Sequence, residues 1–175
     1  MSFSIVWSGD GLLVIALAAP PSRVEARARV RQAVREAAAQ WLSIDIDAIS
    51  VESSPGQVPS LMLAGRTAGL SISHEEGLSL AAIHLHGKVG LDLMVVVEIP
   101  DWEMLARDYL GPSVAASLAA CPEMERARAL AQAWTAREAS LKCAGLQLAE
   151  WSDVIIDCRL QALPVSLPYV ATLAY

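Results

Sequence analysis

The sequence predicts an α+β protein made of two related halves packed together, and three observations lead to this fold class. Short apolar runs with the residue types of strands recur along the chain. Two longer stretches, 22–42 and 122–144, have the boundary residues of helices. No linker is long enough to separate independent domains. We expect an N-terminal half, 1–88, with the order β-β-α-β-β-β, and a C-terminal half, 89–175, with the order β-α-α-α-β-β.

The first half begins with an expected hairpin. Strands over 3–7 and 11–18 flank a turn at Ser8-Gly9-Asp10-Gly11, and Pro20 stops the second strand. Ser22 can cap a helix that runs to about Leu42. Residues 43–68 read as short strands and turns, one of them at Ser53-Ser54-Pro55-Gly56, and strands follow near 69–74 and 78–86.

The second half begins with an expected strand over 89–97. Helices follow near 102–110 and 113–120, and then a long helix over 122–144, with Pro122 in its first turn and Gly145 at its end. The tail alternates in hydropathy, which favours short strands at Val154-Ile155-Ile156, near Leu160 and over Tyr169 to Leu173.

Composition narrows the class of function. Apolar residues make up 54% of the chain, so we expect a sizeable core, yet no run approaches the roughly 18–20 residues that a membrane span needs. A net charge of −6 argues against nonspecific binding to nucleic acid. The three cysteines, Cys121, Cys143 and Cys158, have no CxxC spacing, which favours free thiols in a reducing compartment and a cytoplasmic location.

Two carboxylates stand out as candidates for chemistry. Asp92 lies inside an apolar strand, where an unpaired charge would cost several kcal/mol, and a hard cation would stabilise it. Glu138 and Lys142 are four residues apart and share a helix face, and this spacing by itself is more typical of an exposed ion pair. If that helix packs across the strand end, Asp92 and Glu138 form the pair of carboxylates that suits Mg²⁺ with phosphate oxygens and water.

Three segments together resemble a known family. They read SISHE over 71–75, GLDLM over 90–94 and WTAREASLKCAG over 134–145. Their order and spacing are similar to the "ISHS", "G(V/I)D(I/L)E" and "W(T/A)xKEAxxKxxG" segments of the 4'-phosphopantetheinyl transferases. The longer Sfp-type members, built as two pseudo-symmetric halves, are the most similar, and the similarity covers about residues 40–173.

The resemblance implies a monomeric transferase of the holo-[acyl-carrier-protein] synthase type. Such an enzyme uses Mg²⁺ to move the 4'-phosphopantetheine of coenzyme A onto a serine of an apo acyl or peptidyl carrier protein, and 3',5'-ADP leaves. From the net charge and the short apolar runs, we expect it to bind neither nucleic acid nor membrane.

The family's roles carry over by position. Asp92 and Glu138 match its metal-binding carboxylates, and Glu138 is also the candidate for activating the serine. Lys142 matches the lysine on the coenzyme A phosphates, and Arg137 keeps the charge of another family lysine beside this cofactor. The segment of Ser73 and His74 matches the one that holds the 3'-phosphate.

Two departures from the family pattern leave an alternative open. A glutamate two places after the aspartate is Met94 here, and a "GKP"-like segment appears as Gly56-Gln57-Val58-Pro59, without the lysine. Contacts to the 3'-phosphate would then come from Arg66, or from Arg23 and Arg31. The alternative is a non-catalytic member of the same fold that binds carrier protein or coenzyme A.

Overall fold

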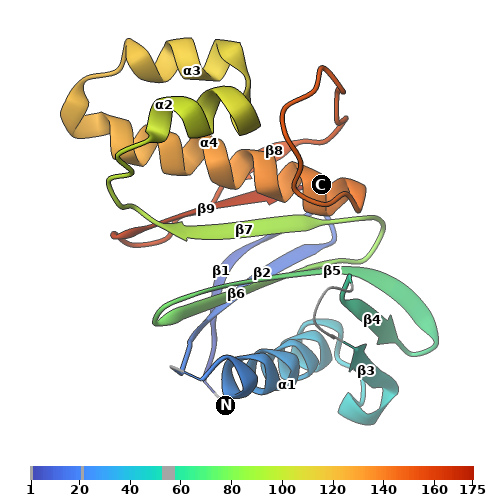
Figure 1. The fold of residues 1–175 in the computed structure, drawn as a ribbon. Helices are drawn as coiled ribbons and strands as arrows, with labels where there is room; N and C mark the ends of the chain where they lie inside the picture. The colour runs from blue at the N-terminus through green and yellow to red at the C-terminus, as the bar shows by residue number, and fades with distance from the viewer. Residues whose placement is uncertain (1, 21, 53–57) are drawn as a thin grey trace.

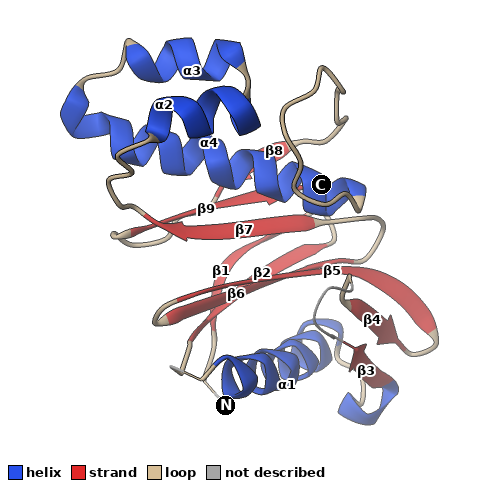
Figure 2. Ribbon diagram, in the orientation of Figure 1, coloured by secondary structure: helices blue, strands red, loops and turns tan. Residues whose placement is uncertain are grey.

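The computed structural model describes residues 2–20, 22–52 and 58–175, and the expected turn at 53–56 and Gln57 lie outside them. Its elements are β1 (Ser4–Gly9), β2 (Leu12–Ala18), α1 (Arg23–Leu42), η1 (Ile46–Ala48), β3 (Ile49–Glu52), β4 (Ser60–Leu63), β5 (Arg66–Glu75), β6 (Leu78–His84), β7 (Gly90–Val95), α2 (Trp102–Leu105), the π-helical turn η2 (Ala106–Leu110), α3 (Pro112–Ala119), α4 (Glu123–Ala144), β8 (Leu160–Ala162) and β9 (Tyr169–Ala174). The mixed α+β class is confirmed (Figure 2).

The elements form layers, with α1 under one sheet and α2 to α4 over the other (Figure 1). The larger sheet has the antiparallel order β1-β2-β6-β5-β4-β3, and the smaller one has the order β7-β9-β8. All strands before residue 88 belong to the first sheet and all later strands to the second. The division at residue 88, and a pseudo-symmetry between the halves, stay predictions.

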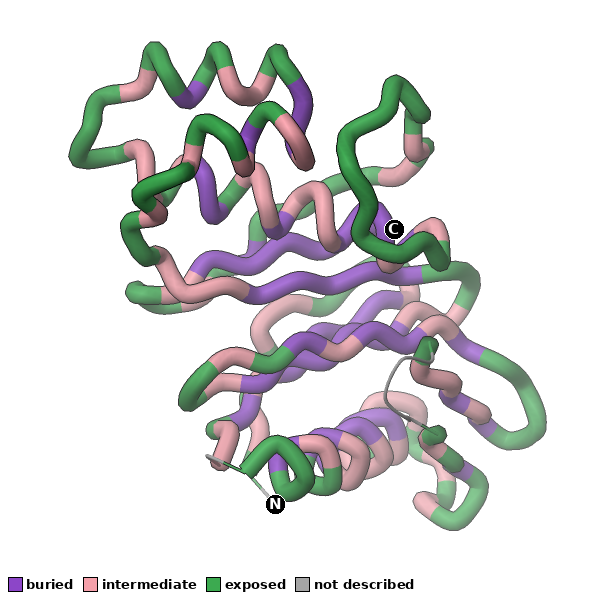
Figure 3. The backbone as a smooth tube through the Cα atoms, in the orientation of Figure 1, coloured by how far each residue is buried: buried purple, intermediate pink, exposed green. Residues whose placement is uncertain are grey.

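Strand β2 shows why the core has two compartments. Its side chains alternate between two apolar surroundings, as the two-residue period of a strand requires. Leu13 and Ile15 pack with Val30 and Val34 of α1, whereas Leu12 and Val14 pack with strands of the smaller sheet. Both faces of β2 are therefore buried, which explains its continuous apolar sequence (Figure 3).

Helix α4 packs very closely on β7, and Gly90 makes this possible. A Cβ atom at this position would overlap the backbone carbonyl oxygen of Ala139 and the backbone nitrogen of Cys143. Only glycine allows the helix to approach so near, and this approach brings the side chains of α4 to the end of β7.

One predicted element is wrong. Residues 154–156 form no strand but lie in the irregular segment between α4 and β8, where Val154 is 63% and Ile155 is 91% exposed. β-branched residues form a strand only where a neighbouring strand can pair with them. Other observed boundaries differ from the predicted ones by a few residues: β6 ends at His84 instead of 86, and β7 ends at Val95 instead of 97.

Candidate functional site

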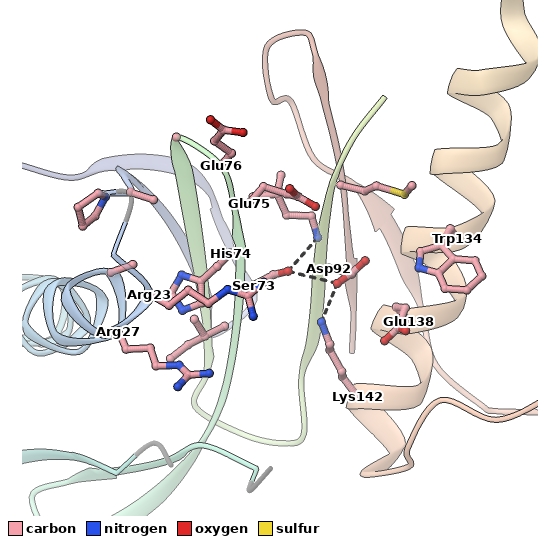
Figure 4. A pocket seen from close by; sticks show the side chains of 17 residues that line it. Arg23, Arg27, Ser73, His74, Glu75, Glu76, Asp92, Trp134, Glu138 and Lys142 are labelled. Carbon is pink, nitrogen blue, oxygen red and sulfur yellow. Dashed lines mark hydrogen bonds and ion pairs between the residues drawn. The ribbon is translucent and has the colours of Figure 1, made fainter. Parts of the chain in front are cut away.

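A cavity of about 1170 Å³ opens between the N-terminal end of α1, the β5–β6 turn, β7 and α4. It contains five of the six residues that the sequence singled out for the site: Ser73, His74, Asp92, Glu138 and Lys142. Residues more than 60 positions apart therefore meet in one place (Figure 4).

One face of α4 forms a wall of this cavity. Trp134, Glu138 and Lys142 follow each other at intervals of four residues, so all three point to the same side. The neighbouring face is buried, where the Thr135 hydroxyl lies 2.9 Å from that of Thr172 in β9. The packed face fixes the rotation of the helix, and this rotation directs Glu138 and Lys142 into the cavity.

Asp92 is the most buried charged group of the site. It is 8% exposed and lies on the face of β7 opposite to Leu91 and Leu93, which pack into the core. The Lys142 ammonium donates a hydrogen bond to Oδ1 of Asp92 at 2.6 Å and another to the Leu91 carbonyl oxygen at 3.1 Å. The Ser73 hydroxyl donates to the same Oδ1 at 3.2 Å. The burial of this carboxylate is thus offset by two donors, one of them charged.

Glu138 faces Asp92 and Lys142 from one turn earlier on α4. Partial burial raises the pKa of Glu138 above its ordinary value of 4.5. The Lys142 ammonium opposes this rise in pKa, and the negative charge of Asp92 adds to it. Two carboxylates that repel each other in one cavity are a place where a cation is favoured.

Three basic side chains lie on the opposite wall, where Glu75 and Glu76 also line the cavity. Arg23 and Arg27 extend from the first turns of α1, and His74 lies beside them at the end of β5 (Figure 4). Desolvation lowers the pKa of His74 below 6.5, and Arg27 and Arg23 lower it further. Its Nδ1 atom lies 2.7 Å from the Ser79 hydroxyl. The three groups together favour an anion at this wall.

Four arginines differ from expectation. Arg137 is not among the residues that line the cavity; its guanidinium lies 5.4 Å from the centre of the Trp151 ring, and its Nε atom is buried without a partner in the described part of the chain. Arg27, which the sequence analysis missed, does line it. The sequence contains a signal for this position, because Arg27 follows Arg23 by one helical turn and therefore lies on the same helix face. Arg31 and Arg66 do not reach this cavity.

The donors fit a magnesium ion in part. Asp92 and Glu138 supply two carboxylates, which is the number Mg²⁺ takes from a protein when phosphates and water complete its shell. Both hydrogen bonds to Asp92 use Oδ1, so Oδ2 has no hydrogen-bond partner among the described residues. Met94, also in the cavity, has a thioether that Mg²⁺ does not favour. No group of three or more acidic, histidine or cysteine side chains that could hold a metal occurs in the described ranges.

Such a cavity defines a class of site. Cations on one wall and a carboxylate pair with an ammonium on the other suit a substrate with several phosphates, one of them beside a divalent cation.

None of the helices in the described residues has the length and apolar character that a membrane span requires.

Comparison with known proteins agrees with this class. The family model of the 4'-phosphopantetheinyl transferase superfamily matches residues 88–174, which include Asp92, Glu138 and Lys142. A protein of Synechocystis sp. that is provisionally named a 4'-phosphopantetheinyl transferase, slr0495, is 28% identical over 80 residues, 46% of this chain and 32% of its own length. The 4'-phosphopantetheinyl transferase HetI of Nostoc sp. is 28% identical over 86 residues, 49% of this chain and 36% of its own.

Residues 88–174 of the chain belong to the 4'-phosphopantetheinyl transferase superfamily. The matched region spans about a third of the length of each of these two relatives.

Proposed function

We propose that this protein transfers the 4'-phosphopantetheine of coenzyme A to a serine of an apo acyl or peptidyl carrier protein. The observation that carries the proposal is the meeting of Asp92, Glu138 and Lys142 in one cavity, opposite the basic side chains of α1 and β5. Coenzyme A has a pyrophosphate and a 3'-phosphate, so a cavity with two separate cationic regions suits its charges.

In the proposed reaction, the serine oxygen forms a bond to the phosphorus on the pantetheine side of the pyrophosphate. The bond between this phosphorus and the bridging oxygen breaks, and 3',5'-ADP leaves with the electron pair. Glu138 accepts the proton of the serine hydroxyl, for which a carboxylate of raised pKa is suited. Lys142 uses two of its three N–H bonds within the protein and can donate the third to a phosphate oxygen.

Asp92 and Glu138 would hold a magnesium ion, which when bound supplies positive charge to the pyrophosphate oxygens. Arg23, Arg27 and His74 would hold the 3'-phosphate. A role of Arg137 toward coenzyme A, a monomeric state and a cytoplasmic location remain predictions; the three free cysteines are compatible with the location.

Mass spectrometry of an apo-carrier protein tests the activity. We expect a mass gain of one phosphopantetheine with this protein, coenzyme A and Mg²⁺, and no gain when EDTA replaces the metal. If coenzyme A binds but no carrier protein from fatty-acid, polyketide or nonribosomal-peptide systems gains mass, the proposed transfer is wrong. Met94 would then favour the non-catalytic alternative, a protein that only binds coenzyme A or the carrier.

Arg27→Ala should weaken the binding of coenzyme A. The lost charge-assisted hydrogen bond is worth about 1.5–3 kcal/mol, so the dissociation constant should rise roughly tenfold or more. Isothermal titration calorimetry in EDTA measures this effect without the metal. Arg29→Ala on the same helix is the matched control, because Arg29 is exposed and does not line the cavity. Equal effects of the two substitutions would contradict a specific contact from Arg27.

Coenzyme A should raise the pKa of His74. In the free protein, burial and the two arginines lower this pKa, so just below pH 6.5 His74 is neutral in the folded state but protonated in the unfolded chain. The contribution of His74 to the free energy of unfolding is therefore present above its ordinary pKa of 6.5. It is lost as the pH falls, because the unfolded chain binds the proton more readily. A phosphate beside the ring stabilises its protonated form. An NMR titration, with His74→Gln to identify the signal, should show the rise with coenzyme A; an unchanged pKa would place the 3'-phosphate elsewhere.

A further inference from the structure

Strand β7 lies at the edge of the smaller sheet, and two serines of β5 bind its open side. β9 pairs with only one side of β7, so backbone N–H groups on the other side need different acceptors. The Leu91 amide donates to the Ser71 hydroxyl at 2.9 Å, and the Leu93 amide donates to the Ser73 hydroxyl at 3.2 Å. The two serines, 5% and 7% exposed, therefore join the two sheets through side chains rather than through strand pairing.

The two serines differ in one respect. Each accepts one backbone hydrogen bond from β7, but only Ser73 also donates to Asp92. A serine hydroxyl has a single proton, and in Ser73 this proton is directed to Oδ1 of Asp92. Ser73 and Lys142 thus bind the same carboxylate oxygen from two directions, which fixes the plane of the Asp92 carboxylate.

We propose that Ser73 is a positioning residue for Asp92, which orients the carboxylate so that its second oxygen, Oδ2, can take a divalent cation. The inference rests on the proposed function, in which Asp92 holds the metal. It differs from the role that the family resemblance implies for Ser73, contact with the 3'-phosphate of coenzyme A. A hydroxyl that already donates to Asp92 has no second proton for a phosphate.

Ser73→Ala and Ser71→Ala form a matched pair for the test. Both remove a buried hydroxyl from the same face of β5 together with one backbone hydrogen bond to β7. Both should lower Tm by a similar few degrees, about 2–4 °C. Only Ser73→Ala removes the bond to Asp92, so any difference between the variants in metal binding reports that bond.

The dissociation constant of Mn²⁺ alone, measured by electron paramagnetic resonance of the free ion, is the first readout. Loss of an outer hydrogen bond to a metal ligand typically weakens metal binding about 10–100-fold, so we expect at least a tenfold increase in Ser73→Ala. Ser71→Ala should stay within roughly twofold of the wild type. Ser73→Thr, which keeps the hydroxyl, should recover most of the affinity for Mn²⁺.

The second readout compares coenzyme A with 3'-dephospho-coenzyme A in EDTA. If Ser73 acts on Asp92, Ser73→Ala should leave the preference for coenzyme A over its dephospho form unchanged. A loss of this preference with unchanged Mn²⁺ binding would overturn the inference and assign Ser73 to the 3'-phosphate. Mn²⁺ binding that Asp92→Asn abolishes but Ser73→Ala does not change would overturn the inference alone. Mn²⁺ binding that is absent from the wild type or independent of Asp92 would overturn both the inference and the proposed metal role.

Discussion

Glu138→Gln should lower the rate of phosphopantetheine transfer at saturating coenzyme A by about 10²–10⁴-fold. Glutamine keeps the size of the side chain but can neither accept the serine proton nor add a negative charge beside Asp92. The initial rate of holo-carrier formation, followed by mass spectrometry, measures the effect. Binding of coenzyme A in EDTA should change little, because the basic wall of the cavity is intact.

Glu125→Gln is the matched control for this substitution. It makes the same change of charge on the same helix, but Glu125 is exposed in the first turn of α4 and does not line the cavity. A Glu138→Gln variant that keeps more than a tenth of the wild-type rate would contradict the assignment of Glu138 as the base. A comparable loss in Glu125→Gln would point to the net charge of the helix instead.

Gly90→Ala should destabilise the fold by about 3 kcal/mol. The added methyl group meets the backbone of α4 at Ala139 and Cys143, which cannot rotate away as a side chain can. For a chain of this length the change corresponds to a Tm that is roughly 6–12 °C lower, measured by circular dichroism. Because α4 must shift, Lys142 moves relative to Asp92, and transfer activity should fall even where the variant is folded.

Gly9→Ala is the control for the added methyl group. At Gly9 the nearest atom to a new Cβ belongs to the Trp7 ring at 3.5 Å, an ordinary contact distance. This variant should melt within about 2 °C of the wild type, as surface substitutions usually do. A Gly90→Ala variant as stable as Gly9→Ala would show that α4 lies farther from β7 than described.

Local signals predicted the elements that carry the site. The Ser22 hydroxyl accepts a hydrogen bond from the Glu25 amide at the start of α1, and Gly145 takes the left-handed conformation, φ 74°, at the end of α4. The four-residue spacing of Glu138 and Lys142 alone predicts that both side chains lie on one face of α4. These features depend on neighbours within a few residues, which is why sequence patterns contain them.

The remaining features depend on contacts between distant segments. Arg27 joins the site only because α1 lies beside the end of β5, and Arg137 lies over Trp151 because the segment after α4 folds back onto that helix. The bond from Ser73 to Asp92 requires β5 to run along the open edge of β7. No spacing along the chain predicts such pairs, since apolar packing between layers decides them.

The sandwich of two sheets has a consequence for substrate affinity. The basic wall belongs to the α1 and β5 side of the molecule, whereas the carboxylates and Lys142 belong to β7 and α4. What sets the separation between the two walls is the apolar interface where Leu12 and Leu80 meet Leu91 and Leu173. Aliphatic side chains that do not line the cavity thus determine its width. Substitutions that repack this interface would change which phosphate-containing ligands fit, although every charged group of the cavity would stay the same.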